Sequence, residues 1–333
     1  MDINEIQQQL FQTIKRKLPS ETPMAEELAK LLDISTDSAY RRMRSEKTIT
    51  IDELYILCNH YRISIDQLMD IQTGSFQFQG NLVDSKNFRF DAYLNGIMHW
   101  MGYFSSFKTK EFYYLCKESP VFHHFYFKEF AAFKYFAWMG TLMFFPEFKN
   151  KKVDFAEYPD AFFQTGQKIL ESYNQLDSVE IWNVECLNTT LRQIDYYREG
   201  GMFKSDEDIV QLYEAIEKTM DHLEKQAELG YKFVHGDPER KPLGKLRMYF
   251  NEVVLGDNQM LAVVDTTKIV FLPHSAFNYI VTRDLAFGEH FYQYLQNLTR
   301  RSTLISEVSE KERARFFKVI RERIARRKEA LKS

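Results

Sequence analysis

Apolar residues recur at helical spacing through the first seventy residues of the chain. Residues 3–18 carry isoleucine or leucine every three or four positions, which predicts an amphipathic helix. The same spacing predicts four more short helices, over residues 23–32, 36–44, 52–62 and 65–69. Ser35 is a suitable N-cap for the third of them. We therefore expect a five-helix bundle over residues 1–73.

Beyond residue 74 the elements become longer and their order changes. Residues 74–82 are expected to form a linker that is extended or strand-like. The apolar spacing predicts helices at 90–105, 125–143, 158–175, 184–199 and 206–229, and an extended segment at 111–116. Residues 83–240 would then be a helical part of the second domain, 83–333.

From Lys245 the apolar period shortens from helical to strand-like. Residues 246–255, 259–265 and 269–274 are separated by short turn sequences, which predicts a three-stranded antiparallel meander. Residues 278–282 are a candidate fourth strand, and helices at 285–300 and 310–331 close the chain. The expected fold class is a helical head followed by a mainly helical α+β domain with a small antiparallel sheet, in which 241–333 is the sheet-bearing part.

Composition narrows the class of protein. Of the 333 residues, 44% are hydrophobic and 15% aromatic, which excludes wholesale disorder. The three cysteines are far apart and form no C-x-x-C pair, so we expect neither a disulfide framework nor a zinc site. No signal peptide is visible, and lysines and a glutamate interrupt the apolar run 122–148. These features predict a cytoplasmic protein without a membrane span.

Charge is distributed unevenly along the chain. Residues 1–73 carry nine Lys or Arg and twelve Asp or Glu, whereas residues 299–333 carry twelve and five. Because the whole chain has a net charge of −3, the middle carries −7. The basic last helix is therefore as well suited to an acidic surface of the same molecule, or of a second subunit, as to DNA.

Residues 25–69 form the most specific pattern in the sequence. Ala29 is small enough for the second and third helices to cross closely, and residues 33–35 make a tight turn between them. Ala39, Tyr40 and Met43 are predicted to face the core. The remaining residues of the third helix and its exit would project outward and contact DNA, through base edges and phosphates: Thr36, Asp37, Ser38, Arg41, Arg42, Arg44 and Lys47.

This segment resembles the Cro/cI-type (XRE) helix-turn-helix family, and most of all its BetR-like branch, in which a S-x-A-Y-R-R pattern occurs. Here residues 37–42 read DSAYRR, and the closing residues 51–69 are similar to the end of the family's domain. The resemblance covers residues 20–70 and implies a five-helix fold, major-groove binding and commonly a dimer. Asp33 and Ser45 stand where the family usually has glycine.

Other candidate sites carry weaker signals. His123 and His124 are adjacent and would point apart on a helix, so we expect no metal site there. No nucleotide-binding, hydrolase or metalloprotease motif occurs, and no cofactor is expected. The aromatic residues of 88–148 favour an ordinary core over an apolar ligand pocket.

Three hypotheses follow for the function. The first is a one-component transcription regulator that binds double-stranded DNA as a homodimer, with a C-terminal domain that senses a small molecule or peptide or builds the dimer. The second is a peptide-responsive sensor with an all-helical repeat body, which the strands after Lys245 disfavour. The third is an enzyme fused to a DNA-binding head, which would need an active site around His274, Asp284 and His290. We expect the first, and no enzyme.

Overall fold

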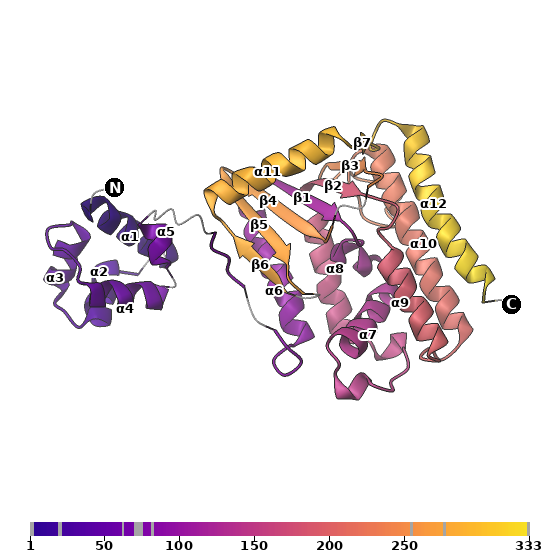
Figure 1. The fold of residues 1–333 in the computed structure, drawn as a ribbon, viewed down its shortest axis with the longest axis horizontal. Helices are drawn as coiled ribbons and strands as arrows, with labels where there is room; N and C mark the ends of the chain where they lie inside the picture. Colours follow the sequence, from indigo (N-terminus) through magenta and orange to yellow (C-terminus); the bar gives the residue numbers. More distant parts are fainter. Residues whose placement is uncertain are drawn as a thin grey trace. The chain divides into compact units, whose positions relative to one another are not determined.

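The computed structural model describes residues 3–18, 22–61, 63–69, 76–80, 83–253, 256–275 and 278–331. The chain forms two compact units, Met1–Ser75 and Phe76–Ser333 (Figure 1). We refer to them as the head and the body.

The head contains five helices where the apolar spacing places them. They are α1 (Ile3–Lys17), α2 (Met24–Leu32), α3 (Thr36–Met43), α4 (Ile51–Tyr61) and α5 (Ile65–Leu68). Leu10 and Ile14 of α1, Leu28 of α2, Ala39 of α3 and Leu57 of α4 are almost fully buried in one core. Leu68 of α5 is buried in the same core, so every one of these helices contributes a buried apolar side chain, as a helical bundle requires.

The body is built on one seven-stranded mixed sheet with the order β6-β5-β4-β1-β2-β3-β7. The strands are β1 (Lys110–Cys116), β2 (Asp177–Trp182), β3 (Leu246–Phe250), β4 (Gln259–Val264), β5 (Thr267–Pro273), β6 (Tyr279–Thr282) and β7 (Thr303–Leu304). Strands β1, β2 and β3 run parallel, whereas the pairs β1–β4, β4–β5, β5–β6 and β3–β7 are antiparallel.

The expectation of a small antiparallel sheet is therefore wrong in size and in pairing. Only β4, β5 and β6 form the meander, while β3, expected as its first strand, pairs with β2 and β7. Strand β2 was not predicted at all. Local alternation identifies a strand but not its partner, and β1, β2 and β3 are separated by long helical connections that only burial in a common core brings together.

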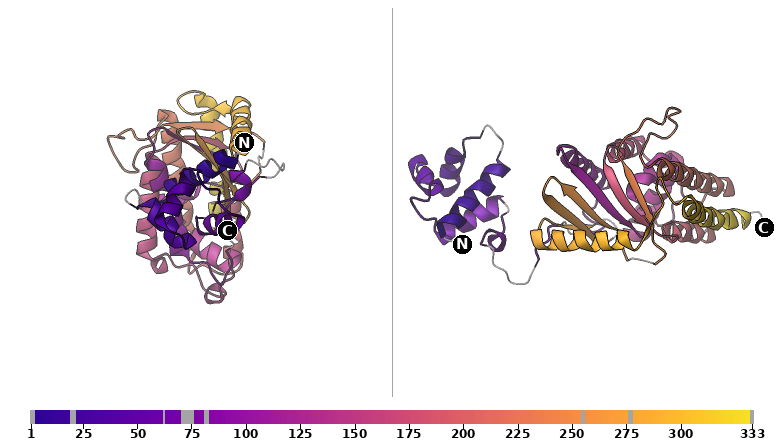
Figure 2. Two further views of the ribbon diagram at one scale, coloured as in Figure 1. Left: turned by 90° about the vertical axis from the view of Figure 1, so that its left-hand side faces the viewer. Right: turned by 90° about the horizontal axis from the view of Figure 1, so that it is seen from above.

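Helices cover both faces of the sheet. One face carries α6 (Phe90–Ser105), α8 (Asp160–Asn174) and α10 (Asp206–Leu229), with α7 (Lys128–Ala137), α9 (Asn188–Glu199) and α12 (Glu310–Glu329) beside them. The other face carries α11 (Leu285–Arg300) (Figure 2). Its Phe291 and Leu295 pack on β1, β2, β4 and β5. The predicted bounds of α6, α10 and α11 are confirmed, and an all-helical repeat body is excluded.

The helix expected over 125–143 is interrupted. It is divided into a 3-10 helix, η1 (Val121–Tyr126), then α7, then a π-helical turn, η2 (Trp138–Leu142). Phe127 adopts an extended conformation at φ −133° and ψ 137°, which separates η1 from α7. Two further 3-10 turns, η3 (Pro146–Phe148) and η4 (Phe155–Glu157), precede α8.

The arginines of α12 bind acidic side chains of the body itself. Arg321 pairs with Asp221 and Glu224 of α10, and Arg327 pairs with Asp195 of α9 at 3.0 Å. Lys328 pairs with Glu217, also of α10, at 2.8 Å. These side chains of the basic last helix therefore contact an acidic surface of the same molecule, which is one of the partners considered for it.

Among the described residues, no helix is long and apolar enough to span a membrane.

Three histidines of the body are buried where they cannot be hydrated. Burial lowers the pKa of His123 to about 4 and that of His222 to about 3, and it lowers the pKa of His124 well below its ordinary value. The ring of His123 stacks on Trp182 with the centroids 5.7 Å apart. A neutral histidine that is charged in the unfolded chain couples folding to pH.

We expect the body to lose stability as the pH falls from about 6.5 toward 4. The unfolded chain binds protons in that range while the folded histidines stay neutral, so acid favours unfolding. His123→Phe keeps a stacking ring and removes one titrating group, and it should recover about 2 kcal/mol of unfolding free energy at pH 5 relative to pH 7. Urea unfolding followed by tryptophan fluorescence measures this in the body, because all three tryptophans lie there. His290→Gln, at an exposed position of α11, is the control and should leave the pH dependence unchanged.

Candidate functional site

The outward face of α3 is the first candidate site. Thr36, Asp37, Arg41 and Arg44 are exposed, Ser38 is half-buried, and Lys47 is exposed in the loop that follows. Among the described residues, the Arg41 guanidinium forms no ion pair, and Arg44 has only a loose, exposed one with Glu46 at 3.7 Å. A short helix therefore presents hydroxyl groups at its beginning and cationic groups at its end.

The turn between α2 and α3 fixes the start of this helix. Asp33 adopts the left-handed conformation at φ 53° and ψ 49°, which an aspartate tolerates better than most residues. Ser35 caps α3, because its hydroxyl oxygen accepts a hydrogen bond from the Ser38 N–H at 3.2 Å. Ser45, after the helix, also has a positive φ of 59°. Both positions where the resembled family usually has glycine thus have the backbone conformation that glycine favours.

Arg42 does not project outward, contrary to the expectation. Its side chain is only 5% exposed, and its Nε and Nη2 donate to the two carboxylate oxygens of Glu53 at 2.9 and 2.6 Å. These hydrogen bonds hold the pKa of Glu53 below its ordinary value. The side chain expected in the core, Tyr40, is instead 47% exposed, and the Arg44 guanidinium lies 5.9 Å from its ring centroid. The helix is rotated relative to the expected face, so Tyr40 joins the exposed set and Arg42 leaves it.

Gln7 is a structural residue of this site that sequence reasoning missed. It lies on the buried side of α1 and is 3% exposed. Its amide nitrogen donates to the carbonyls of Arg42 and Lys47 at 2.7 and 2.8 Å, and its oxygen accepts from the Ile49 N–H at 3.1 Å. Three hydrogen bonds from one side chain thus hold the loop that carries Lys47. The sequence signal for this structural role of Gln7 is a polar residue among the apolar residues on one face of a helix.

The other candidates from the sequence do not form a reactive cluster. Asp284 caps α11 by accepting from the Phe287 N–H at 2.8 Å, and His274 and His290 are exposed. His123 and His124 lie in the aromatic core, and no group of three potential metal ligands occurs among the described residues.

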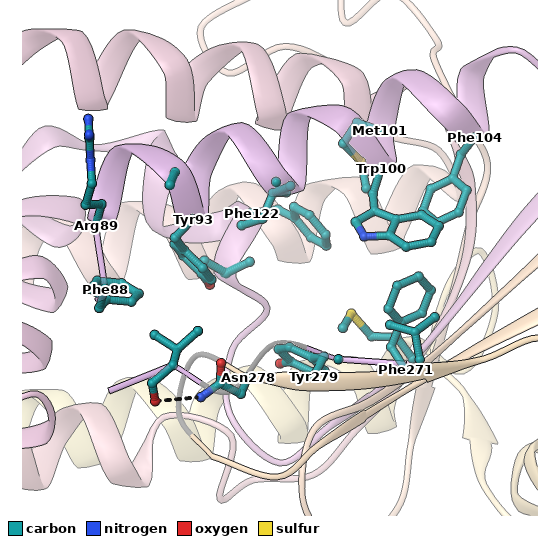
Figure 3. A pocket seen from close by; sticks show the side chains of 18 of the residues that line it. Phe88, Arg89, Tyr93, Trp100, Met101, Phe104, Phe122, Phe271, Asn278 and Tyr279 are labelled. Carbon is teal, nitrogen blue, oxygen red and sulfur yellow. Dashed lines mark hydrogen bonds between the residues drawn. The ribbon is translucent and has the colours of Figure 1, made fainter. Parts of the chain in front are cut away.

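The body contains a second candidate site, a cavity of about 650 Å³ between α6 and the sheet (Figure 3). Trp100 and Phe104 of α6 face Phe271 of β5, with the Trp100 and Phe271 rings edge to face at 4.9 Å. Phe122 of η1 and Met260 of β4 also line it. The aromatic residues of 88–148, for which an ordinary core was favoured, therefore supply both a core and one wall of this cavity.

Polar groups are few in the cavity wall. Tyr93 of α6, Tyr114 of β1 and Tyr279 of β6 are the tyrosines among its lining residues. Burial raises the pKa of Tyr279 to about 12 and raises the pKa values of Tyr93 and Tyr114 well above the ordinary value, so all three hydroxyls are protonated at neutral pH. The cavity therefore offers neutral hydroxyl groups on an apolar wall.

No protein-family model matches this sequence, and no curated protein matches it. The solved structures include one chain that aligns over 88% of this chain and 98% of its own length, with 8% sequence identity and a TM-score of 0.24. It is described as the structure of TrmBL2, an archaeal chromatin protein with a novel mode of DNA binding. A TM-score this low supports no conclusion about fold or function.

The buried ion pair generates a prediction about the head. Arg42→Ala should destabilise it by about 3 kcal/mol, because Glu53 is left partly buried without its partner. Hydrogen exchange of the full-length protein, read by mass spectrometry on peptides from α3 and α4, should then speed up about a hundredfold. Arg41→Ala removes an exposed arginine one position earlier and should leave the exchange unchanged. Equal exchange in the two variants would show that the Arg42–Glu53 pair does not hold the head together.

Proposed function

We propose that the protein is a DNA-binding transcription regulator of the one-component type. Its head is a Cro/cI-like (XRE) helix-turn-helix domain, similar to the BetR-like branch, and α3 is its recognition helix. The observation that carries the proposal is the exposed, N-capped face of α3, with Arg41 and Arg44 directed to solvent. A recognition helix offers its first residues to base edges and uses cationic side chains to hold phosphates.

The contacts within the head support this role for α3. The ion pair of Arg42 with Glu53 and the three hydrogen bonds of Gln7 fix the end of α3 and the loop to Lys47 before any DNA is bound. Pre-organised cationic groups lose less conformational entropy on binding than mobile ones. We propose Thr36, Asp37, Ser38, Tyr40, Arg41, Arg44 and Lys47 as the DNA-facing set.

For the body we propose signal sensing or subunit assembly, and no catalysis. A homodimer would place two copies of α3 on half-sites about one helical turn apart. The cytoplasm is the proposed compartment, and the three free, buried cysteines are compatible with a reducing environment. Asp284, which the enzyme alternative needs, caps α11 by accepting a hydrogen bond from the Phe287 N–H.

Selection from a random duplex DNA library by the full-length protein, followed by affinity measurements at several salt concentrations, tests the proposal. We expect one enriched sequence, and Arg41→Ala should weaken its binding about tenfold to a hundredfold if the side chain contacts a base. A phosphate contact would instead lower the slope of log affinity against log salt by about one.

Arg326→Ala is the matched control, since this arginine is exposed on α12 of the body. It should change neither the affinity nor the salt slope. No enrichment in the selection, or equal effects of Arg41→Ala and Arg326→Ala, would refute DNA recognition by α3.

A further inference from the structure

We propose that the body cavity binds an uncharged, ring-containing small molecule that carries a carbonyl or hydroxyl oxygen, to which the hydroxyl groups of Tyr114 and Tyr279 in the cavity wall donate a hydrogen bond. The binding itself is a property of the body and needs no DNA. Only the role of this molecule as an effector rests on the proposed function.

The size and lining of the cavity indicate a ligand more than a packing fault. Ligand pockets are clefts or cavities that range from about 300 to 1,000 Å³ and are lined mostly by apolar and aromatic side chains. The cavity measures about 650 Å³ and is walled by aromatic rings from α6, η1 and the sheet. Rings that face a hollow lack dispersion partners on that side, and a flat apolar ligand supplies them.

The surface of α6 is shaped to leave this space open. Tyr93, Ile97 and Trp100 lie on its cavity side and are only half-buried, while Leu94 is buried in the core. Gly96 lies in the middle of the cavity stripe, and a Cβ added there would meet nothing within 4 Å. A glycine inside a helix costs about 0.5–1 kcal/mol relative to alanine. Here it keeps the cavity clear of a side chain.

The tyrosine pair supplies the polar contact. Tyr114 and Tyr279 both line the cavity, and a protonated tyrosine hydroxyl can donate one hydrogen bond to an acceptor. Tyr114 is 2% exposed, so its hydroxyl lies in an apolar setting where a donor without an acceptor is costly. A carbonyl or hydroxyl oxygen of a ligand satisfies it.

The lining also argues against an anionic ligand. Arg89 is the charged residue among the lining residues, and its side chain is 75% exposed and paired with Asp91 at 2.5 Å. An ionised carboxylate inside the cavity would lose its hydration and find no buried cation. The geometry favours a neutral ring system over a fatty acid.

Isothermal titration calorimetry of the full-length protein with three probes tests the proposal. Flavone is flat, neutral and carries a carbonyl, 2-phenylnaphthalene has similar rings without oxygen, and dodecanoate is a flexible anion. We expect flavone to bind with micromolar affinity, 2-phenylnaphthalene about fivefold to tenfold more weakly because it lacks the hydrogen bond, and dodecanoate not measurably.

Two glycines of α6 give a matched pair of variants. Gly96→Leu places a side chain in the cavity and should weaken flavone binding at least tenfold. Gly102→Leu makes the same change on the same helix, where an added Cβ also meets nothing within 4 Å, but Gly102 does not line the cavity. Gly102→Leu should therefore leave the affinity for flavone within twofold of that of the unchanged protein. Tyr279→Phe should weaken flavone about fivefold and leave 2-phenylnaphthalene unaffected.

Three results would overturn the proposal. They are the failure of both neutral probes to bind, equal effects of the two leucine variants, or dodecanoate binding more tightly than flavone and losing affinity with Arg89→Ala. Loss of DNA binding in the Arg41→Ala protein would not change these titrations, so failure of the ligand proposal and failure of the DNA proposal are separately visible.

Discussion

The body depends on one constraint, that three parallel strands must be covered on both faces. Parallel strands are joined by crossovers, and here the crossovers supply α8 and α10 on one face of β1, β2 and β3 while α11 covers the other. The antiparallel strands β4, β5 and β6 extend the sheet beyond these crossover helices. On the α8 and α10 face of that extension, α6 is the covering helix of the described chain and packs beside α8. The cavity lies where this cover is incomplete.

Charge follows from the same architecture. The acidic middle of the sequence and the basic last helix carry opposite net charges, and the fold brings them together through Arg321, Arg327 and Lys328. These ion pairs are only partly exposed, and together they neutralise the charges where α12 packs on α9 and α10. The positive charge of α12 therefore reflects its packing on acidic helices of the body and not a nucleic-acid site. The cationic groups left to solvent in α3 are those of Arg41 and Arg44.

The rotation of α3 shows how tertiary contacts override side-chain type. An arginine is usually exposed and a tyrosine is frequently buried, which led to the expected assignment. Glu53, at the beginning of α4, accepts two hydrogen bonds from Arg42 and one from the Thr50 N–H, so the pair is fully satisfied under the helix. A bidentate pair of this kind makes burial of an arginine acceptable. Tyr40 then lies on the outer side.

The sequence by itself determined what depends on neighbours within a few turns. It specified the five helices of the head, the capping role of Ser35, the left-handed Asp33 and the bounds of α6, α10 and α11, because caps, turns and helical stripes act over short distances. Only the tertiary structure decided the partner of β3, the existence of β2 as a central strand, the burial of Arg42, the bonds of Gln7 and the cavity. Each of these features requires contact between two segments that are far apart in the sequence, and a local sequence pattern does not identify the partner segment.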